Sequence, residues 1–392
     1  MINNQMLCLN MILGNCAPYI LRKALNSVMP YVDKAIIGWN GNDKEVIELL
    51  DSYPKIERFT QVWDGDFAKA RNEVLDKTPK GTLVIWLDED DELLNGQELI
   101  DFCKLAFAQE PVKSIAVEWF YAHDKHGNCS ASLWRERVVR TDLFRWCRHP
   151  LHETLDYIGA DDIPNVICEN AKIKHLATYE KMLKSGKRNL DIITKQYEKE
   201  VQEGKLSNKT IYDTARSYQG VGELDKAVEL FKDYINNGVS DEEKCITYTI
   251  IGEIYKFQGK VEESKRCALQ TIMMGSNIPD GYIDLASCLF IEGKHHPASV
   301  FLETSFKFKP CKSFPINPMK YSVQPMKILA ACYMYLGEFE KAVKCANYVL
   351  SKIPDDARMK SVIEIGVSSL EQINKFDKEN NDKTTINASG NS

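Results

Sequence analysis

Apolar and polar positions change their spacing near residue 185 of the chain. Before that point, short β-rich runs alternate with segments in which apolar residues recur at helical spacing. The expected strands cover 6–13, 34–39, 57–63 and 82–88, and the expected helices cover 19–32, 45–53 and 66–78. This β-α-β-α-β-α-β order predicts an α/β domain with a doubly wound, mostly parallel sheet.

The second part of the chain contains an internal repeat centred on glycine. The four aligned glycines are Gly222, Gly259, Gly293 and Gly337. A small residue lies seven positions before each glycine, an aromatic residue or leucine four positions before it, and another small residue five positions after it. The pattern resembles the tetratricopeptide repeat, a helix-turn-helix unit of 34 residues, and it predicts an all-α repeat domain. Four unrelated amphipathic helix pairs are the alternative.

These patterns divide the chain into three parts. We expect the α/β domain over 1–190, the tetratricopeptide-repeat domain over 191–372 and a polar, disordered tail over 373–392. The last two repeat glycines are separated by an insert at 309–321, "KPCKSFPINPMKY", which is rich in proline, lysine and aromatic residues.

Composition and charge exclude several classes of protein. The net charge of −6 argues against a general nucleic-acid or anionic-membrane binder. Twelve cysteines are scattered without a CxxC pair, which favours free thiols in a reducing, cytoplasmic setting. No run approaches 18 apolar residues, so no transmembrane segment is expected, and the N-terminus lacks the basic region of a signal peptide.

A dense group of acids, "DEDDE" at 88–92, follows the fourth expected strand. In doubly wound sheets, ligands bind at the carboxyl ends of the strands, so these acids face the expected crevice. Alternate residues of an extended chain point the same way, and a slight turn would let Asp88 and Asp90 reach one Mg²⁺ or Mn²⁺. A solvated acidic turn that caps the next helix is the alternative interpretation.

Five short motifs give the region from about residue 5 to 190 a family resemblance. The quoted segments are "LCLNMIL", "DFAKARN", "WLDEDDEL", "LHETL" and "IKHLATYEKMLKSGKRNLDII". Their identity and order resemble the family 2 glycosyltransferases with a GT-A fold. The resemblance implies a metal-dependent, inverting transfer of a hexose from a nucleotide sugar, by default UDP-glucose or another UDP-hexose. Trp39 stands where that family usually has an aspartate, which leaves the nucleotide open.

The resemblance also implies roles for individual residues. Asp88, Asp90 and His175 would hold the metal, and Glu153 would act as the general base with His152 beside it. The nucleotide sugar would be bound by a further set of residues: Asp43, Asp64, Asp66, Arg71, Asp88, Lys187 and Arg188.

Several of these residues also have simpler interpretations. Asp91 or Glu89 could be the base instead, and His175 could be structural. Arg71 could form a surface ion pair, and the basic pair at 187–188 could be a solvated helix start.

The acceptor and the partners follow from the order of the domains. Repeat domains of this kind bind peptides on a concave face, so the sequence predicts a peptide partner near the repeats. The domain order resembles the peptide S- or O-glycosyltransferases of the sublancin type, which modify Cys or Ser of bacteriocin peptides. A polysaccharide or lipid-linked acceptor is one alternative, and a non-catalytic peptide-binding scaffold or a nucleotidyltransferase are others. Exposed repeat edges also leave room for a homodimer.

Overall fold

A computed structural model describes most of the chain, namely residues 2, 5–15, 17–109, 111–124, 127–148, 153–176, 179–275 and 277–389, without the side chains of 109, 179–185 and 377–389. The chain forms two compact units, which we describe separately. The first contains Met1–His123, Cys129–Glu223 and Lys312–Pro315. The second contains Asp124–Asn128, Leu224–Cys311 and Ile316–Ser392.

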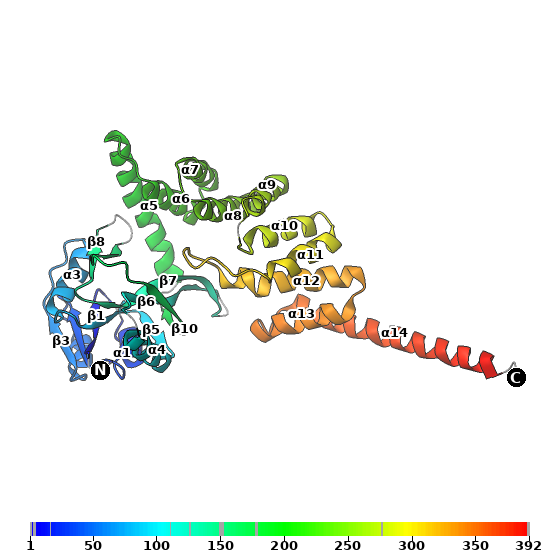
Figure 1. Ribbon diagram of the computed structural model, residues 1–392, viewed down its shortest axis with the longest axis horizontal. Coiled ribbons are helices and arrows are strands. Elements are labelled where there is room, and N and C mark those ends of the chain that lie inside the picture. The colour runs from blue at the N-terminus through cyan, green and yellow to red at the C-terminus, as the bar shows by residue number, and fades with distance from the viewer. Residues whose placement is uncertain are drawn as a thin grey trace. The chain divides into compact units, whose positions relative to one another are not determined.

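The first unit begins with the alternation that the sequence predicts (Figure 1). Its first seven elements are β1 (Leu7–Ile12), α1 (Pro18–Val28), β2 (Lys34–Gly38), α2 (Lys44–Asp51), β3 (Ile56–Phe59), α3 (Phe67–Lys77) and β4 (Leu83–Trp86). The elements that follow are β5 (Asp91–Leu94), α4 (Gly96–Gln109), β6 (Ser114–His123), β7 (Cys129–Arg140), β8 (Phe144–Cys147), β9 (Thr154–Tyr157), β10 (Asn165–His175), α5 (Tyr179–Gln202) and α6 (Asn208–Gly220). The predicted α/β class is therefore confirmed.

The main sheet has the strand order β3-β2-β1-β4-β7-β6-β10-β5. The strands β3, β2, β1 and β4 are parallel to their neighbours, as the sequence predicts. Strand β7 is antiparallel to β4 and β6, and β5 is antiparallel to β10. The sheet is thus mixed, because β6 and β7 follow one another without a crossover helix and a direct reversal produces antiparallel strands. The structure shows a mixed α/β unit, and it does not by itself show the GT-A fold.

Side chains that alternate along the strands place a core on each face of this sheet. Leu7, Leu9 and Met11 of β1 belong to one buried cluster with residues of α1, α2 and α4. Cys8 of the same strand belongs to a second cluster, together with Trp86 and residues of α3. Successive strand residues point to opposite faces, so helices cover both sides of the sheet and leave the strand ends for a site.

The second unit is a stack of helix pairs (Figure 1). Its helices are α7 (Leu224–Asn236), α8 (Asp241–Phe257), α9 (Val261–Met273), α10 (Asp280–Ile291), α11 (His295–Ser305), the 3₁₀ helix η1 (Pro318–Tyr321), α12 (Val323–Leu336), α13 (Phe339–Lys352) and α14 (Ala357–Ser389). The predicted glycines 259, 293 and 337 lie in the turns within three helix pairs, each with a positive φ of 74–75° that glycine adopts without strain. The small repeat residues Ala286 and Ala298 are fully buried, so paired helices approach closely.

The structure bears on the predictions about membrane-spanning segments and cysteines. Within the described ranges, no helix is both long and apolar enough to cross a bilayer. The cysteines in those ranges are free, and most of them are buried.

Candidate functional site

The acids of 88–92 lie where β4 ends and β5 begins. The N–H of Asp91 donates to the carbonyl oxygen of Asp88 at 3.0 Å, which closes the turn between the two strands. Strand β5 then pairs with β10 in a register that sets Asp91 opposite His175. The strand pairing therefore brings His175 to the acids across 84 residues of sequence.

The deepest contact in this region is an ion pair between Asp91 and Arg137 of β7. Both side chains are fully buried, and Nη1 of Arg137 donates to Oδ2 of Asp91 at 2.9 Å. The indole Nε1 of Trp119 donates to Oδ1 of Asp91, also at 2.9 Å. The guanidinium of Arg137 lies 3.8 Å from the ring centroid of Trp86. Burial lowers the pKa of Arg137, and the negative charge of Asp91 opposes that shift.

A second arginine, Arg71 of α3, holds two carboxylates at once. It donates to Asp88 at 2.5 Å and to Glu153 at 2.6 Å, and only 8% of Arg71 is exposed. Burial would raise the pKa of Asp88, but the charges of Arg71 and Arg137 outweigh burial and lower this pKa to about 2. The acids are thus neutralised largely by arginines of the same chain.

Three side chains form a group that could hold a metal ion. A ligand atom from each of Asp90, Asp91 and His175 lies within 4.8 Å of the other two. Nδ1 of His175 is 3.1 Å from Asp91 Oδ1 and 3.4 Å from Asp90 Oδ1. Burial would lower the pKa of His175, but the hydrogen bond with Asp91 and the charge of Asp90 raise it. Asp88 lies outside this group, and its carboxylate accepts a hydrogen bond from Arg71.

Three of the predicted binding residues serve local structure elsewhere in the first unit. Asp43 caps α2, where its side chain accepts from the N–H groups of residues 45 and 46. Asp66 caps α3 in the same way, and Asp64 is exposed and pairs with Lys69. The contacts of these aspartates are therefore made at helix starts.

The remaining predicted residues are spread over other places. Lys187 and Arg188 are exposed on α5. Glu153 reaches the site through Arg71, whereas His152 lies outside the described residues. An open groove of about 660 Å³ along α3 is lined by Asp66, and Arg71 lines a separate cavity of about 10 Å³, so these two residues do not share a pocket.

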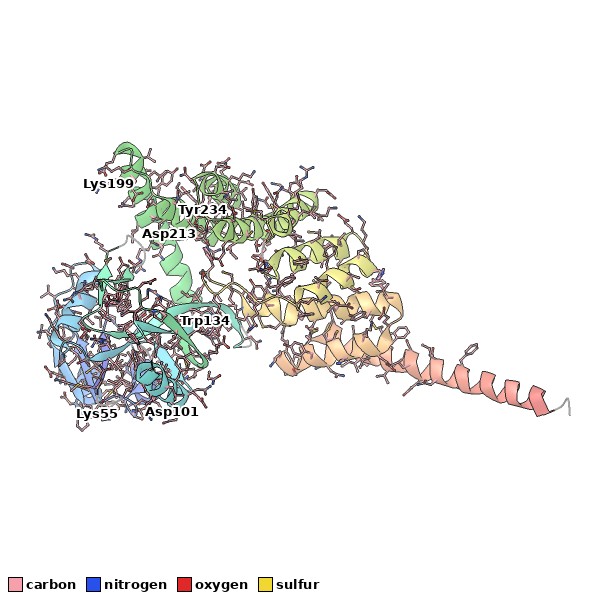
Figure 2. The ribbon with its side chains drawn as sticks, in the orientation of Figure 1. Lys55, Asp101, Trp134, Lys199, Asp213 and Tyr234 are labelled. Atoms are coloured by element: carbon pink, nitrogen blue, oxygen red, sulfur yellow. The ribbon has the colours of Figure 1, made fainter. Side chains whose placement is uncertain are left out.

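Tryptophan side chains near these acids belong partly to the core. The rings of Trp146 and Trp86 meet edge to face with centroids 4.8 Å apart. Arg135 lies 5.3 Å from the Trp86 centroid. Trp134, labelled in Figure 2, is half-buried on β7, and Nζ of Lys172 lies 4.9 Å from its ring centroid.

Sequence reasoning missed Arg137 and gave Asp91 only a secondary role. The signal was present in "WRERVVR" at 134–140, where Arg135 and Arg137 alternate along a strand. Residues two apart in a strand share a face, and an arginine on a buried strand face requires a negative partner, so this spacing indicates an internal ion pair.

Known proteins that resemble this chain are found among the solved structures. No protein-family model matches the chain, and no curated protein matches it. The chain is similar to a solved structure of MamA with 18% identity and a TM-score of 0.35, covering 46% of this chain and 98% of that one. It is similar to YrrB, described as "a TPR protein with an unusual peptide-binding site", with 15% identity and a TM-score of 0.36, covering 45% and 84%. It is also similar to Cut9–Hcn1 with 14% identity and a TM-score of 0.39, covering 49% and 34%.

The solved structures named above do not include the family that the motifs suggested. The solved structures named above are not glycosyltransferases, and YrrB is a tetratricopeptide-repeat protein by its description. The comparisons do not bear out the prediction of a family 2 glycosyltransferase, nor those of an enzyme, of hexose transfer and of bacteriocin modification. The motif residues make structural contacts in the first unit: Asp66 caps α3, Arg71 pairs with Asp88 and Glu153, and the side chain of Asn72 bonds the backbone of Trp146.

Proposed function

We propose that this chain is a non-catalytic scaffold that binds a peptide on the face formed by the first helices of its repeats. The observation that carries this proposal is the arrangement of the helix pairs in the second unit. Helix α8 packs against α10, and α10 packs against α12, so these first helices form one continuous face. Stacked repeats of this kind present an extended concave surface to a partner.

The chemistry of this face supports a polar peptide as the ligand. Glu253 and Lys256 of α8 lie beside Asp284 of α10, with Lys256 Nζ 3.1 Å from Asp284 Oδ1. The side chain of Glu253 is 43% exposed, so its carboxylate is open to a partner from outside. Charged groups that flank an open helical face give specificity to peptide recognition.

A peptide library tests the proposed function. Labelled 12-residue peptides of random sequence are presented to the full chain, and binding is measured by fluorescence anisotropy. We expect some peptides to bind with a Kd on the order of micromolar. Glu253→Gln should weaken the best of them about fivefold or more, because the variant removes a charge from the binding face.

The matched control is Glu263→Gln, the same change at an exposed position on α9. Glu263 lies on a second helix of a repeat, so its loss should leave the affinity unchanged. A chain that binds no library peptide, or that responds equally to both substitutions, would not be a peptide scaffold of this kind.

We further propose that Asp90 and His175 bind Mn²⁺ or Mg²⁺ in the first unit. The supporting observation is the group of ligand atoms within 4.8 Å of one another. Asp91 already accepts hydrogen bonds from Arg137 and Trp119, so it would orient the site more than coordinate the ion. One imidazole beside carboxylates suits Mn²⁺ better than Ca²⁺, which prefers oxygen ligands alone.

Metal addition should stabilise the first unit, since an ion that binds only the folded state favours that state. At a hundred times its Kd, Mn²⁺ should add about 2.7 kcal/mol to the unfolding free energy. Asp90→Asn should remove this gain, whereas Asp101→Asn on the exposed face of α4 (Figure 2) should retain it. The measurement is the thermal midpoint with and without Mn²⁺; equal gains in both variants would exclude Asp90 as a ligand.

A further inference from the structure

The insert at 309–321 and the residue just before it contact the helices of the proposed binding face through side chains. The ring of Phe308 stacks on Tyr282 of α10, with centroids 5.0 Å apart and planes inclined by 19°. Sγ of Cys311 lies 3.0 Å from Oε1 of Glu242, at the start of α8. Phe308 and Cys311 therefore contact the same two helices that we propose for peptide binding.

At the end of the insert, Lys320 of η1 enters an acidic pocket between these helices. Its Nζ lies 2.7 Å from Glu253 Oε1, 2.9 Å from Asp284 Oδ2 and 3.2 Å from Asp280 Oδ1. An ammonium group has three donors, and here three carboxylates accept them. The hydroxyl of Tyr321 donates to Asp280 at 2.9 Å. Lys320 and Tyr321, together with Lys256 of α8 at 3.1 Å from Asp284 Oδ1, thus satisfy most of the pocket.

The pocket requires a cation to remain stable. Asp280 and Asp284 are each only 2% exposed. Among the described residues, Oδ2 of Asp280 has no hydrogen-bond partner even with Lys320 in place. Removing one partner of a buried ion pair leaves an uncompensated charge in the interior, which is strongly unfavourable. Any group that displaces Lys320 must therefore bring a positive charge of its own.

The acids and the cation have different origins in the repeat pattern. The acids lie on α8 and α10, which are regular repeat helices. Lys320 comes from the longer interval, in which the glycines are 44 residues apart instead of the 34 of the preceding interval. The pocket is thus a feature of the repeats, and the insert supplies an occupant that a repeat of ordinary length lacks.

We propose that this pocket recognises a lysine side chain of a peptide partner, and that Lys320 is its resident and displaceable occupant. The proposal rests on the proposed function, because it specifies which peptides the repeat face would bind. The partner presents a lysine, with an aromatic residue next to it, in the manner of Lys320 and Tyr321. The exchange of Lys320 for the partner's lysine begins at Glu253, whose side chain is partly exposed.

A peptide that copies residues 312–322, labelled with fluorescein, tests the exchange on the full chain. We expect Lys320→Ala to bind it at least tenfold more tightly than the wild-type chain, because the pocket is then empty. A peptide with alanine at the position of Lys320 should bind neither chain. Equal affinity of both chains for the copied peptide, or tight binding of the alanine peptide, overturns the proposal.

A second measurement uses the wild-type chain and so does not depend on the folding of a variant. Reductive methylation followed by mass spectrometry reports how accessible each lysine is. Lys320 should be protected at first, and saturating copied peptide should raise its labelling at least fivefold. Lys294, which is 56% exposed, should be labelled equally with and without peptide. Unchanged protection of Lys320 in the presence of bound peptide overturns the proposal.

The pocket assignment and the scaffold function can fail separately. If library peptides bind but their affinity does not depend on lysine, the pocket assignment is wrong and the scaffold function stands. If no peptide binds the wild-type chain or Lys320→Ala, both the pocket assignment and the scaffold function are wrong.

Discussion

Replacing Arg137 with methionine is expected to lower the unfolding free energy of the first unit by about 3–5 kcal/mol. Arg137 and Asp91 are both fully buried, so the variant leaves the Asp91 carboxylate without its cation in a site that water does not reach. The six tryptophans of the chain, at 39, 63, 86, 119, 134 and 146, all lie in the first unit. Tryptophan fluorescence during urea unfolding therefore reports this unit alone.

Two further variants control the Arg137 prediction. Arg145→Met removes the surface pair with Asp76, in which both side chains are 40% exposed or more, and should cost about 1 kcal/mol or less. The double variant Arg137→Met with Asp91→Leu removes both charges and should be more stable than Arg137→Met alone. A loss below about 1 kcal/mol in Arg137→Met would show that the buried pair does not stabilise the unit.

Leu302→Ala is expected to destabilise the second unit by about 2–5 kcal/mol. Leu302 of α11 is fully buried in a cluster that also contains Ala286, Ala330 and Val349, and truncation leaves a cavity between two helix pairs. Circular dichroism at 222 nm detects the loss of helix, and tryptophan fluorescence should not change in parallel, because the second unit contains no tryptophan.

The matched control for Leu302 is Ile291→Ala. Ile291 is 56% exposed at the end of α10, so its truncation should change stability by about 0.5 kcal/mol or less. Hydrogen exchange should place the Leu302→Ala loss in α10, α11 and α12, since each repeat contacts mainly its neighbours. Equal losses in both variants, or a loss spread evenly over the chain, would contradict a stack of repeats.

Features set by local chemistry could be predicted from the sequence. The strand and helix alternation of the first unit follows from apolar spacing, and the helix pairs follow from glycines at fixed distances from small residues. Gly337, for example, ends α12 with a φ of 75°, a conformation that the repeat pattern requires and that few other residues adopt.

Features set by long-range pairing could not be predicted in the same way. The pairing of β5 with β10 brings His175 to Asp91, and no local pattern records which strand pairs with which. The Arg137–Asp91 pair spans 46 residues, and Lys320 meets Glu253 across 67. The short motifs also contain residues whose long-range contacts no local pattern records: Arg71, for example, pairs with Glu153 across 82 residues.

The most direct test of the scaffold account is hydrogen exchange of the full chain with and without its tightest library peptide. The account predicts that the peptide slows exchange in α8, α10 and α12, which form the binding face. Exchange in α9, in the exposed half of α11 and throughout the first unit should stay the same. Protection confined to the first unit, or no protection at saturating peptide, would contradict the claim that these repeats bind peptides.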